Sequence, residues 1–196
     1  FCPGSSGEEA RVPLDSEIVT KEAPIEGVYS YSDVDRLHPN YEAIEYLRQQ
    51  ELFEGYSDGS FRPDQAINRE ELVRLLVGMK GEGIPAEVGG NCYTDVLQQD
   101  FARAICFASE RAWVEGYDDG DFRPQQPVSR AESVKMIMTI LDFDSSDIRE
   151  ESYSDVPQDV WFAPYVWQAK EAGLLDEAAV FKPADLAKRS FVAEVV

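Results

Sequence analysis

Three basic residues stand at the starts of predicted helices, where a cation is electrostatically disfavoured. Arg69 and Arg130 occupy the same place in two similar segments, and Lys188 holds the corresponding charge in a third. A cation in the first helical turn lies against the positive end of the helix dipole, which costs about 0.3 to 1 kcal/mol when exposed. A guanidinium beside helix-terminal N–H groups could clamp a carboxylate or a phosphate. The alternative is that each cation pairs with an acidic residue of a neighbouring segment.

Other side chains in the same segments could bind a hydroxyl-rich ligand. Trp161 lies at a predicted helix start and offers the flat aromatic face on which sugar rings stack. Neither of the other two segments has an aromatic residue at the aligned position. Asp33, Asp95 and Asp155 each stand ahead of a helix, where a carboxylate can cap the helix or anchor a loop. Binding of sugar hydroxyl groups is the alternative role for these three.

The sequence carries no recognisable catalytic constellation. It has no nucleophile elbow, no glycine-rich phosphate loop and no histidine-rich metal pattern, and His38 is its only histidine. The Asp-Gly pairs at 58–59 and 119–120 could belong to calcium loops, but Gln65 or Gln126 stands where an EF-hand needs Glu. We therefore expect a non-catalytic protein without a metal site or a cofactor, and glycan hydrolysis is the least favoured interpretation.

Composition and charge argue against several classes of partner. The 196 residues include 18 basic and 38 acidic side chains, which give a formal net charge of −20 at pH 7. Such a charge repels nucleic acid and anionic lipid, so we expect no nucleic-acid partner. No apolar run approaches the roughly 20 residues of a membrane-spanning helix. The start lacks the charged and apolar regions of a signal peptide, and we interpret the chain as a fragment or a processed product.

The three cysteines have no spacing typical of a zinc or redox motif. Cys92 and Cys106 lie 14 residues apart. In an exported protein a local disulfide between them and two buried thiols are both reasonable interpretations. Cys2 could carry a lipid, but the phenylalanine before it is bulkier than a lipidation motif usually allows.

The chain repeats itself three times in one order. The segment Tyr31–Val34 recurs as Tyr93–Val96 and as Tyr153–Val156, at offsets of 62 and 60 residues. GYSDGSFRP at 55–63 recurs as GYDDGDFRP at 116–124, whereas the third copy is shorter and keeps only Phe-Lys-Pro. Repeats of this length indicate an array of similar supersecondary units.

Each repeat predicts a helix, a turn and a second helix. In the middle repeat the second helix has one apolar face, formed by Val134, Ile137, Met138 and Leu141. A capping box starts this helix in the first two repeats, as Asn-Arg-Glu-Glu from position 68 and Ser-Arg-Ala-Glu from position 129. One helical hairpin has too little apolar surface to fold alone. We therefore expect an all-α, pseudo-threefold bundle in which the second helices share a core.

The repeats divide the chain into four predicted parts. Residues 1–29 mix Gly, Ser, Pro and Glu without apolar periodicity and form an irregular N-terminal linker or tail. The first repeat covers 30–91 and the second 92–151. A degenerate, truncated third repeat covers 152–196.

These motifs resemble those of the S-layer homology family. Its repeats run from Phe/Tyr-x-Asp-Val, through Gly-Tyr-x-Asp-Gly-x-Phe-Arg-Pro, to a Thr-Arg-Ala-Glu helix start, and the resemblance covers about Tyr31 to Val196. It implies a three-lobed bundle of repeats with grooves between the lobes. It also implies an extracellular module that attaches proteins to cell-wall polysaccharide, often bearing pyruvyl ketals, or to peptidoglycan-linked polymers.

The resemblance assigns a glycan-binding role to particular residues. The family's arginine corresponds to Arg69 and Arg130 and less closely to Lys188, because the third repeat lacks the capping Glu. The family's aromatic residue near the first helix corresponds to Trp161. The predicted glycan-binding set is completed by repeat-motif residues: Asp33, Asp95, Asp155, Gly55, Tyr56, Gly116 and Tyr117.

Two functions of different classes follow. The leading hypothesis is non-covalent anchoring of a surface protein to the cell envelope, through cell-wall polysaccharide bound between the repeats. The alternative is a structural assembly module of a surface layer or filament. That module would self-associate or bind a protein through its degenerate third repeat, without glycan.

Overall fold

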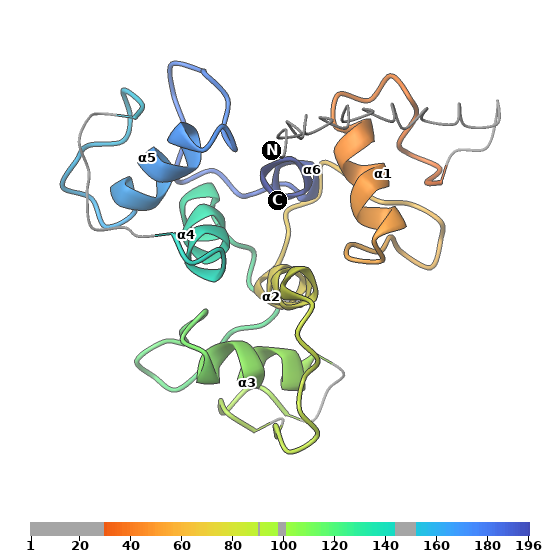
Figure 1. Cartoon of the computed structure of the whole chain (residues 1–196), viewed down its shortest axis with the longest axis vertical. Helices are drawn as coiled ribbons and strands as arrows, with labels where there is room; N and C mark the ends of the chain where they lie inside the picture. Colours follow the sequence, from red (N-terminus) through yellow and green to blue (C-terminus); the bar gives the residue numbers. More distant parts are fainter. Residues whose placement is uncertain (1–29, 90, 98–100, 144–151) are drawn as a thin grey trace, which may run out of the picture.

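The computed structural model describes residues 30–89, 91–97, 101–143 and 152–196 (Figure 1). These described residues form six helices: α1 (Tyr41–Gln49), α2 (Arg69–Lys80), α3 (Ala102–Glu110), α4 (Arg130–Ile140), α5 (Ala163–Glu171) and α6 (Arg189–Val195). Within the described ranges the backbone forms isolated bridges but no β-strand, so the all-α prediction is confirmed. None of the described helices is long and apolar enough to span a bilayer. The predicted N-terminal linker and Cys2 lie outside the described residues.

Side-chain caps explain why two of the second helices start where they do. The Asn68 side chain accepts from the N–H of Glu71, and the Glu71 carboxylate accepts from the N–H of Asn68. Ser129 and Glu132 form the same reciprocal pair at the start of α4, so both predicted capping boxes are confirmed. At the start of α6 the N-cap is Lys188, whose side chain makes no capping bond.

Backbone bonds between repeats complete these helix starts. In cyclic order the N–H groups of Arg69, Arg130 and Arg189 donate to the carbonyl oxygens of Gln126, Asp185 and Gln65, at 3.0, 2.8 and 2.9 Å. Each acceptor belongs to the following repeat, and the first repeat serves the third. Neighbouring repeats therefore already satisfy these helix-terminal donors, so they are not free for a ligand.

A ring of three hydrogen bonds lies where the repeats meet. The N–H of Ile67 donates to the carbonyl of Ala187, Ala187 donates to Val128, and Val128 donates to Ile67, at 2.9, 2.9 and 3.1 Å. All three side chains are fully buried. This closed ring gives the bundle its pseudo-threefold centre and joins the last repeat to the first.

Each lobe of the molecule combines helices from two repeats. Helix α3 packs on α2, α5 packs on α4, and α1 packs on α6, with α2, α4 and α6 nearest the centre (Figure 1). A first helix thus contacts the second helix of the preceding repeat. On the apolar face of α4, Val134, Ile137 and Met138 are buried, whereas Leu141 lies beyond the helix end and is exposed.

In the first two repeats, equivalent residues link the opening segment to the first helix by different chemistry. In the second repeat Cys92 and Cys106 form a disulfide, with their sulfur atoms 2.11 Å apart. In the first repeat the corresponding residues are Ser30 and Glu45, and the Ser30 hydroxyl donates to the Glu45 carboxylate at 2.8 Å. A covalent bond therefore replaces a hydrogen bond at this place in the middle repeat.

Candidate functional site

A groove borders each arginine that starts a second helix. The three grooves have volumes of about 410, 310 and 330 Å³. We name them the Arg69 groove, the Arg189 groove and the Arg130 groove after the arginine that lines each. Every groove is lined by residues of at least two repeats, so each depends on the packing of one repeat against another.

Arg189, and not Lys188, is the third member of the arginine set. The Nε atoms of Arg69, Arg130 and Arg189 donate to the carbonyl oxygens of Phe122, Phe181 and Phe61, at 2.8, 2.8 and 2.9 Å. Lys188 precedes the helix, is exposed, and pairs with Asp64 at 2.7 Å. The predicted equivalence of Lys188 is thus wrong by one residue, since the shorter third turn and adjacent Lys and Arg obscure the register.

The arginines are held by carbonyl groups of the neighbouring turn. Arg69 is 7% exposed; its Nη2 donates to the carbonyl of Glu115 at 2.8 Å, and its guanidinium lies 4.4 Å from the ring centroid of Phe122. Among the described residues no carboxylate forms an ion pair with Arg69 or Arg130. These bonds offset the unfavourable helix dipole and leave further guanidinium N–H groups beside the groove.

Arg189 forms an ion pair with a carboxylate of the protein itself. It is 2% exposed, and its Nη1 lies 3.0 Å from the carboxylate of Glu71. Its Nη2 donates to the carbonyl of Glu54 at 2.8 Å. Burial lowers the pKa of Arg189 and the Glu71 carboxylate partly restores it, so the charge is retained and already paired.

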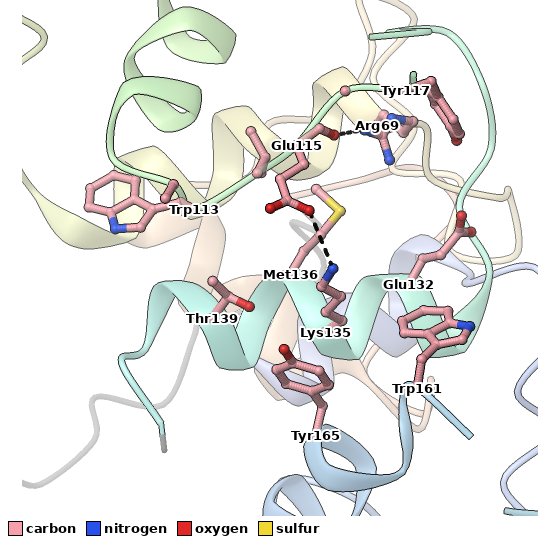
Figure 2. Close-up of a pocket in the computed structure, with 13 residues that line it drawn as sticks. Arg69, Trp113, Glu115, Tyr117, Glu132, Lys135, Met136, Thr139, Trp161 and Tyr165 are labelled. Atoms are coloured by element: carbon pink, nitrogen blue, oxygen red, sulfur yellow. Dashed lines mark hydrogen bonds and ion pairs between the residues drawn. The ribbon is translucent and has the colours of Figure 1, made fainter. Parts of the chain in front are cut away.

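The Arg69 groove combines an ammonium group with an exposed aromatic face (Figure 2). The Nζ of Lys135 lies 5.7 Å from the ring centroid of Trp161 and 3.8 Å from the carboxylate of Glu115. Trp161 is 56% exposed and precedes α5, and Tyr165 from the first turn of α5 lines the same groove. A stacking surface and a cation thus face one cavity.

The predicted glycine-tyrosine pairs line two of the grooves, but they pack against or bond to other residues of the protein. Gly116 and Tyr117 line the Arg69 groove, and Gly55 and Tyr56 line the Arg189 groove. A Cβ on either glycine would overlap the ring of the tyrosine that opens its repeat. The Tyr56 hydroxyl donates to the carboxylate of Glu71 at 3.1 Å. These residues shape the grooves and offer few free polar groups.

The three predicted aspartates lie elsewhere. In Asp33, Asp95 and Asp155 both carboxylate oxygens accept backbone N–H groups from the Phe-Arg/Lys-Pro element of the same repeat, all at 2.7 Å. None of them lines one of the three grooves. Burial opposes ionisation of Asp155, but the two backbone N–H bonds prevail and lower its pKa. The geometry matches the loop-anchor interpretation and leaves these carboxylates outside the grooves.

The two Asp-Gly turns, which were the candidates for calcium loops, have carboxylates that pair with arginines. Gly59 and Gly120 adopt positive φ angles, as tight turns require. Asp58 pairs with Arg62 at 2.9 Å, and Asp119 pairs with Arg123 at 2.6 Å. Arginines of the same turns therefore already pair with the carboxylates that a calcium ion would need.

Sequence reasoning missed Lys135 and Arg189. A signal for Lys135 exists, because Arg74 recurs at the same place of the preceding second helix and lines the Arg189 groove. The groove that Lys135 or Arg189 lines depends on which turn packs against its helix. Local periodicity does not report that pairing.

Comparisons with known proteins agree with this architecture. The model of the S-layer homology domain matches residues 30–73 and 93–132. Cell surface glycoprotein 1 of Acetivibrio thermocellus is 30% identical over 140 residues, which are 67% of this chain and 6% of that protein. The cellulosome-anchoring protein of the same bacterium is 30% identical over 135 residues, 67% of this chain and 30% of that protein. The middle cell wall protein of Brevibacillus brevis is 37% identical over 98 residues, 48% of this chain and 9% of that protein.

Proposed function

The chain contains repeats of the S-layer homology family, and from this premise we propose that it anchors a surface protein to the cell envelope. Its place is extracellular, at the cell surface or cell wall, as the names of its relatives state for them. The chain spans between 6% and 30% of the length of the relatives described above. That an attached surface protein is the cargo of this anchor is therefore part of the proposal. The anchor acts without covalent bonds, by binding cell-wall polysaccharide between the repeats.

The Arg69 groove is the main binding site in this proposal. A sugar ring stacks on the exposed face of Trp161, and an acidic substituent, such as a pyruvyl ketal, binds the ammonium of Lys135. The unused guanidinium N–H groups of Arg69 donate to the same ligand. The observation that carries the proposal is that these three groups line one cavity of about 410 Å³.

The other two grooves suit an acidic sugar less well. In the Arg189 groove the guanidinium already holds the carboxylate of Glu71, so a ligand acid would have to displace it. In the Arg130 groove the place of Lys135 is taken by Glu194. A carboxylate there repels an acidic ligand. One groove therefore dominates the affinity for acidic polysaccharide.

The test compares matched groove residues. Replacement of Arg69 would break its bonds to two carbonyls and disturb the fold, so Lys135→Gln and Trp161→Ala are the informative changes. The double variant should bind purified cell-wall polysaccharide at least tenfold more weakly in calorimetry. Arg74→Gln changes the equivalent cation of the Arg189 groove and should alter the affinity less than twofold.

Two results would overturn the proposal. Unchanged affinity of the folded double variant would remove the Arg69 groove from binding. Absence of any binding, together with self-association in light scattering, would favour the assembly module instead.

A further inference from the structure

The Arg130 groove differs from the other two in the sign of one charge. The sixth residue of the second helix is Arg74 in α2, Lys135 in α4 and Glu194 in α6. These residues line the Arg189 groove, the Arg69 groove and the Arg130 groove, respectively. Glu194 is exposed, and its carboxylate accepts a hydrogen bond from the Asn40 side chain at 2.8 Å. The same architecture thus presents a carboxylate where its two copies present a cation.

A second acidic residue, Asp176, lines this groove, and Arg130 is the one lysine or arginine among the lining residues to balance the two carboxylates. Asp176 stands where Glu115 stands in the preceding repeat, but the Lys135 that pairs with Glu115 has no cationic counterpart here. The backbone carbonyl of Asp176 accepts from the Tyr153 hydroxyl. Burial, followed by the charges of Asp176 and Glu177, raises the pKa of Tyr153 to about 12, while the charge of Arg130 acts in the opposite direction.

The arginine of this groove is partly buried and contacts two aromatic rings. The guanidinium of Arg130 lies 3.8 Å from the ring centroid of Phe191 and 4.9 Å from that of Phe181. Its Nε is bound to the carbonyl of Phe181. The remaining N–H groups can donate to neutral oxygen acceptors, while Glu194 and Asp176 remain as the acceptors exposed to solvent.

We propose that the Arg130 groove binds a hexosamine residue whose amino group is not acetylated. The ammonium pairs with Glu194 and Asp176, Arg130 donates to ring hydroxyl groups, and the apolar wall of Phe191 and Leu175 contacts the sugar face. The volume of about 330 Å³ lies in the range of small-ligand sites. Acetylation would remove the charge of the ligand and with it the attraction to Glu194 and Asp176. This site is independent of the ligand of the Arg69 groove.

The probes are a glucosamine tetramer and its fully N-acetylated form, which share a backbone and differ in charge. We expect the free amine to bind at least tenfold more tightly in calorimetry and to shift the NMR signals of the Asn40 side-chain amide. Glu194→Gln should weaken its binding at least fivefold. Glu171→Gln removes the same charge from an exposed residue outside the groove and should change the affinity less than twofold.

Equal affinity for the two tetramers would overturn the proposal. So would equal effects of Glu194→Gln and Glu171→Gln, because the amine would then be attracted only by the net charge of −20. The Lys135→Gln, Trp161→Ala variant should bind the glucosamine tetramer as the unaltered protein does. Failure of the acidic-glycan proposal and failure of this one are therefore separate results.

Discussion

The guanidinium of Arg189 and the carboxylate of Glu71 lie 3.0 Å apart, although 118 residues separate them in the chain. This ion pair and the backbone ring of Ile67, Val128 and Ala187 connect the last repeat to the first. The bundle is therefore a closed cycle, and the Arg189 groove in particular is lined by residues of the first and the last repeat.

Loss of Arg189 should destabilise the whole bundle. Arg189→Ala removes the cation from Glu71 and the donor from two backbone carbonyls, and removal of one member of a buried ion pair costs about 3 kcal/mol or more. Urea unfolding monitored by circular dichroism should give this decrease in a single transition. Two separate transitions would contradict the closed-cycle account.

The neighbouring Lys188 supplies the control for this measurement. Its pair with Asp64 is exposed, and such surface pairs contribute about 0 to 1 kcal/mol. Lys188→Ala should therefore leave the free energy of unfolding nearly unchanged. If both substitutions had equal effects, the assignment of Arg189 as the structural arginine would be wrong.

The disulfide should stabilise the second repeat. A cross-link that closes a loop of this length restricts the unfolded chain and contributes roughly 3 kcal/mol in the loop-entropy model, and Cys92 and Cys106 are 14 residues apart. Reduction with a dithiol should lower the free energy of unfolding by about 2 to 3 kcal/mol. Identical unfolding curves for the oxidised and reduced protein would contradict this expectation.

Asp155 should make stability depend on pH in the acidic range. Its folded pKa is lower than its ordinary value of 3.8, so it stabilises the fold above that pH and ceases to do so as the pH falls through the folded pKa. Asp155→Asn should be less stable at pH 7 and should lose less stability on acidification than the unaltered protein. Parallel stability curves from pH 7 to pH 2 would contradict the assigned role.

Glu115 should compete with an acidic ligand for Lys135. The carboxylate lies 3.8 Å from the ammonium and is 79% exposed, so it can be displaced at little cost. Glu115→Gln should raise the affinity for acidic polysaccharide about two- to threefold, because an exposed pair contributes about 0 to 1 kcal/mol. The backbone carbonyl that holds Arg69 is unaffected by this change. A lower affinity in calorimetry would show that the carboxylate itself binds the glycan.

Local signals predicted much of the fold. The capping residues Asn68 and Ser129 and the turn glycines Gly59 and Gly120 act within a few residues, so their sequence patterns are sufficient to place helix starts and turns. At the third helix start these signals fail, since Lys188 takes the N-cap position without a capping side chain. The register there is set by bonds that reach the first repeat.

The composition of the grooves could not be predicted from one sequence. Trp161 and Lys135 face one cavity because α5 packs on α4, whereas helical periodicity identifies an apolar face without identifying its partner. The role of Asp33 likewise depends on N–H groups 28 and 29 residues away. Such contacts join residues that are distant in the sequence. They decide which residues anchor loops and which line the grooves.

The most direct test of polysaccharide binding in the Arg69 groove uses the three tryptophans of the chain. Trp161 and Trp113 line this groove, whereas Trp167 lines none of the three grooves. Each indole N–H gives its own NMR signal, and a purified fragment of cell-wall polysaccharide can be titrated against all three. We predict that the Trp161 signal moves most, that the Trp113 signal follows, and that the Trp167 signal stays in place. Saturable binding that leaves the Trp161 signal unmoved would contradict the account.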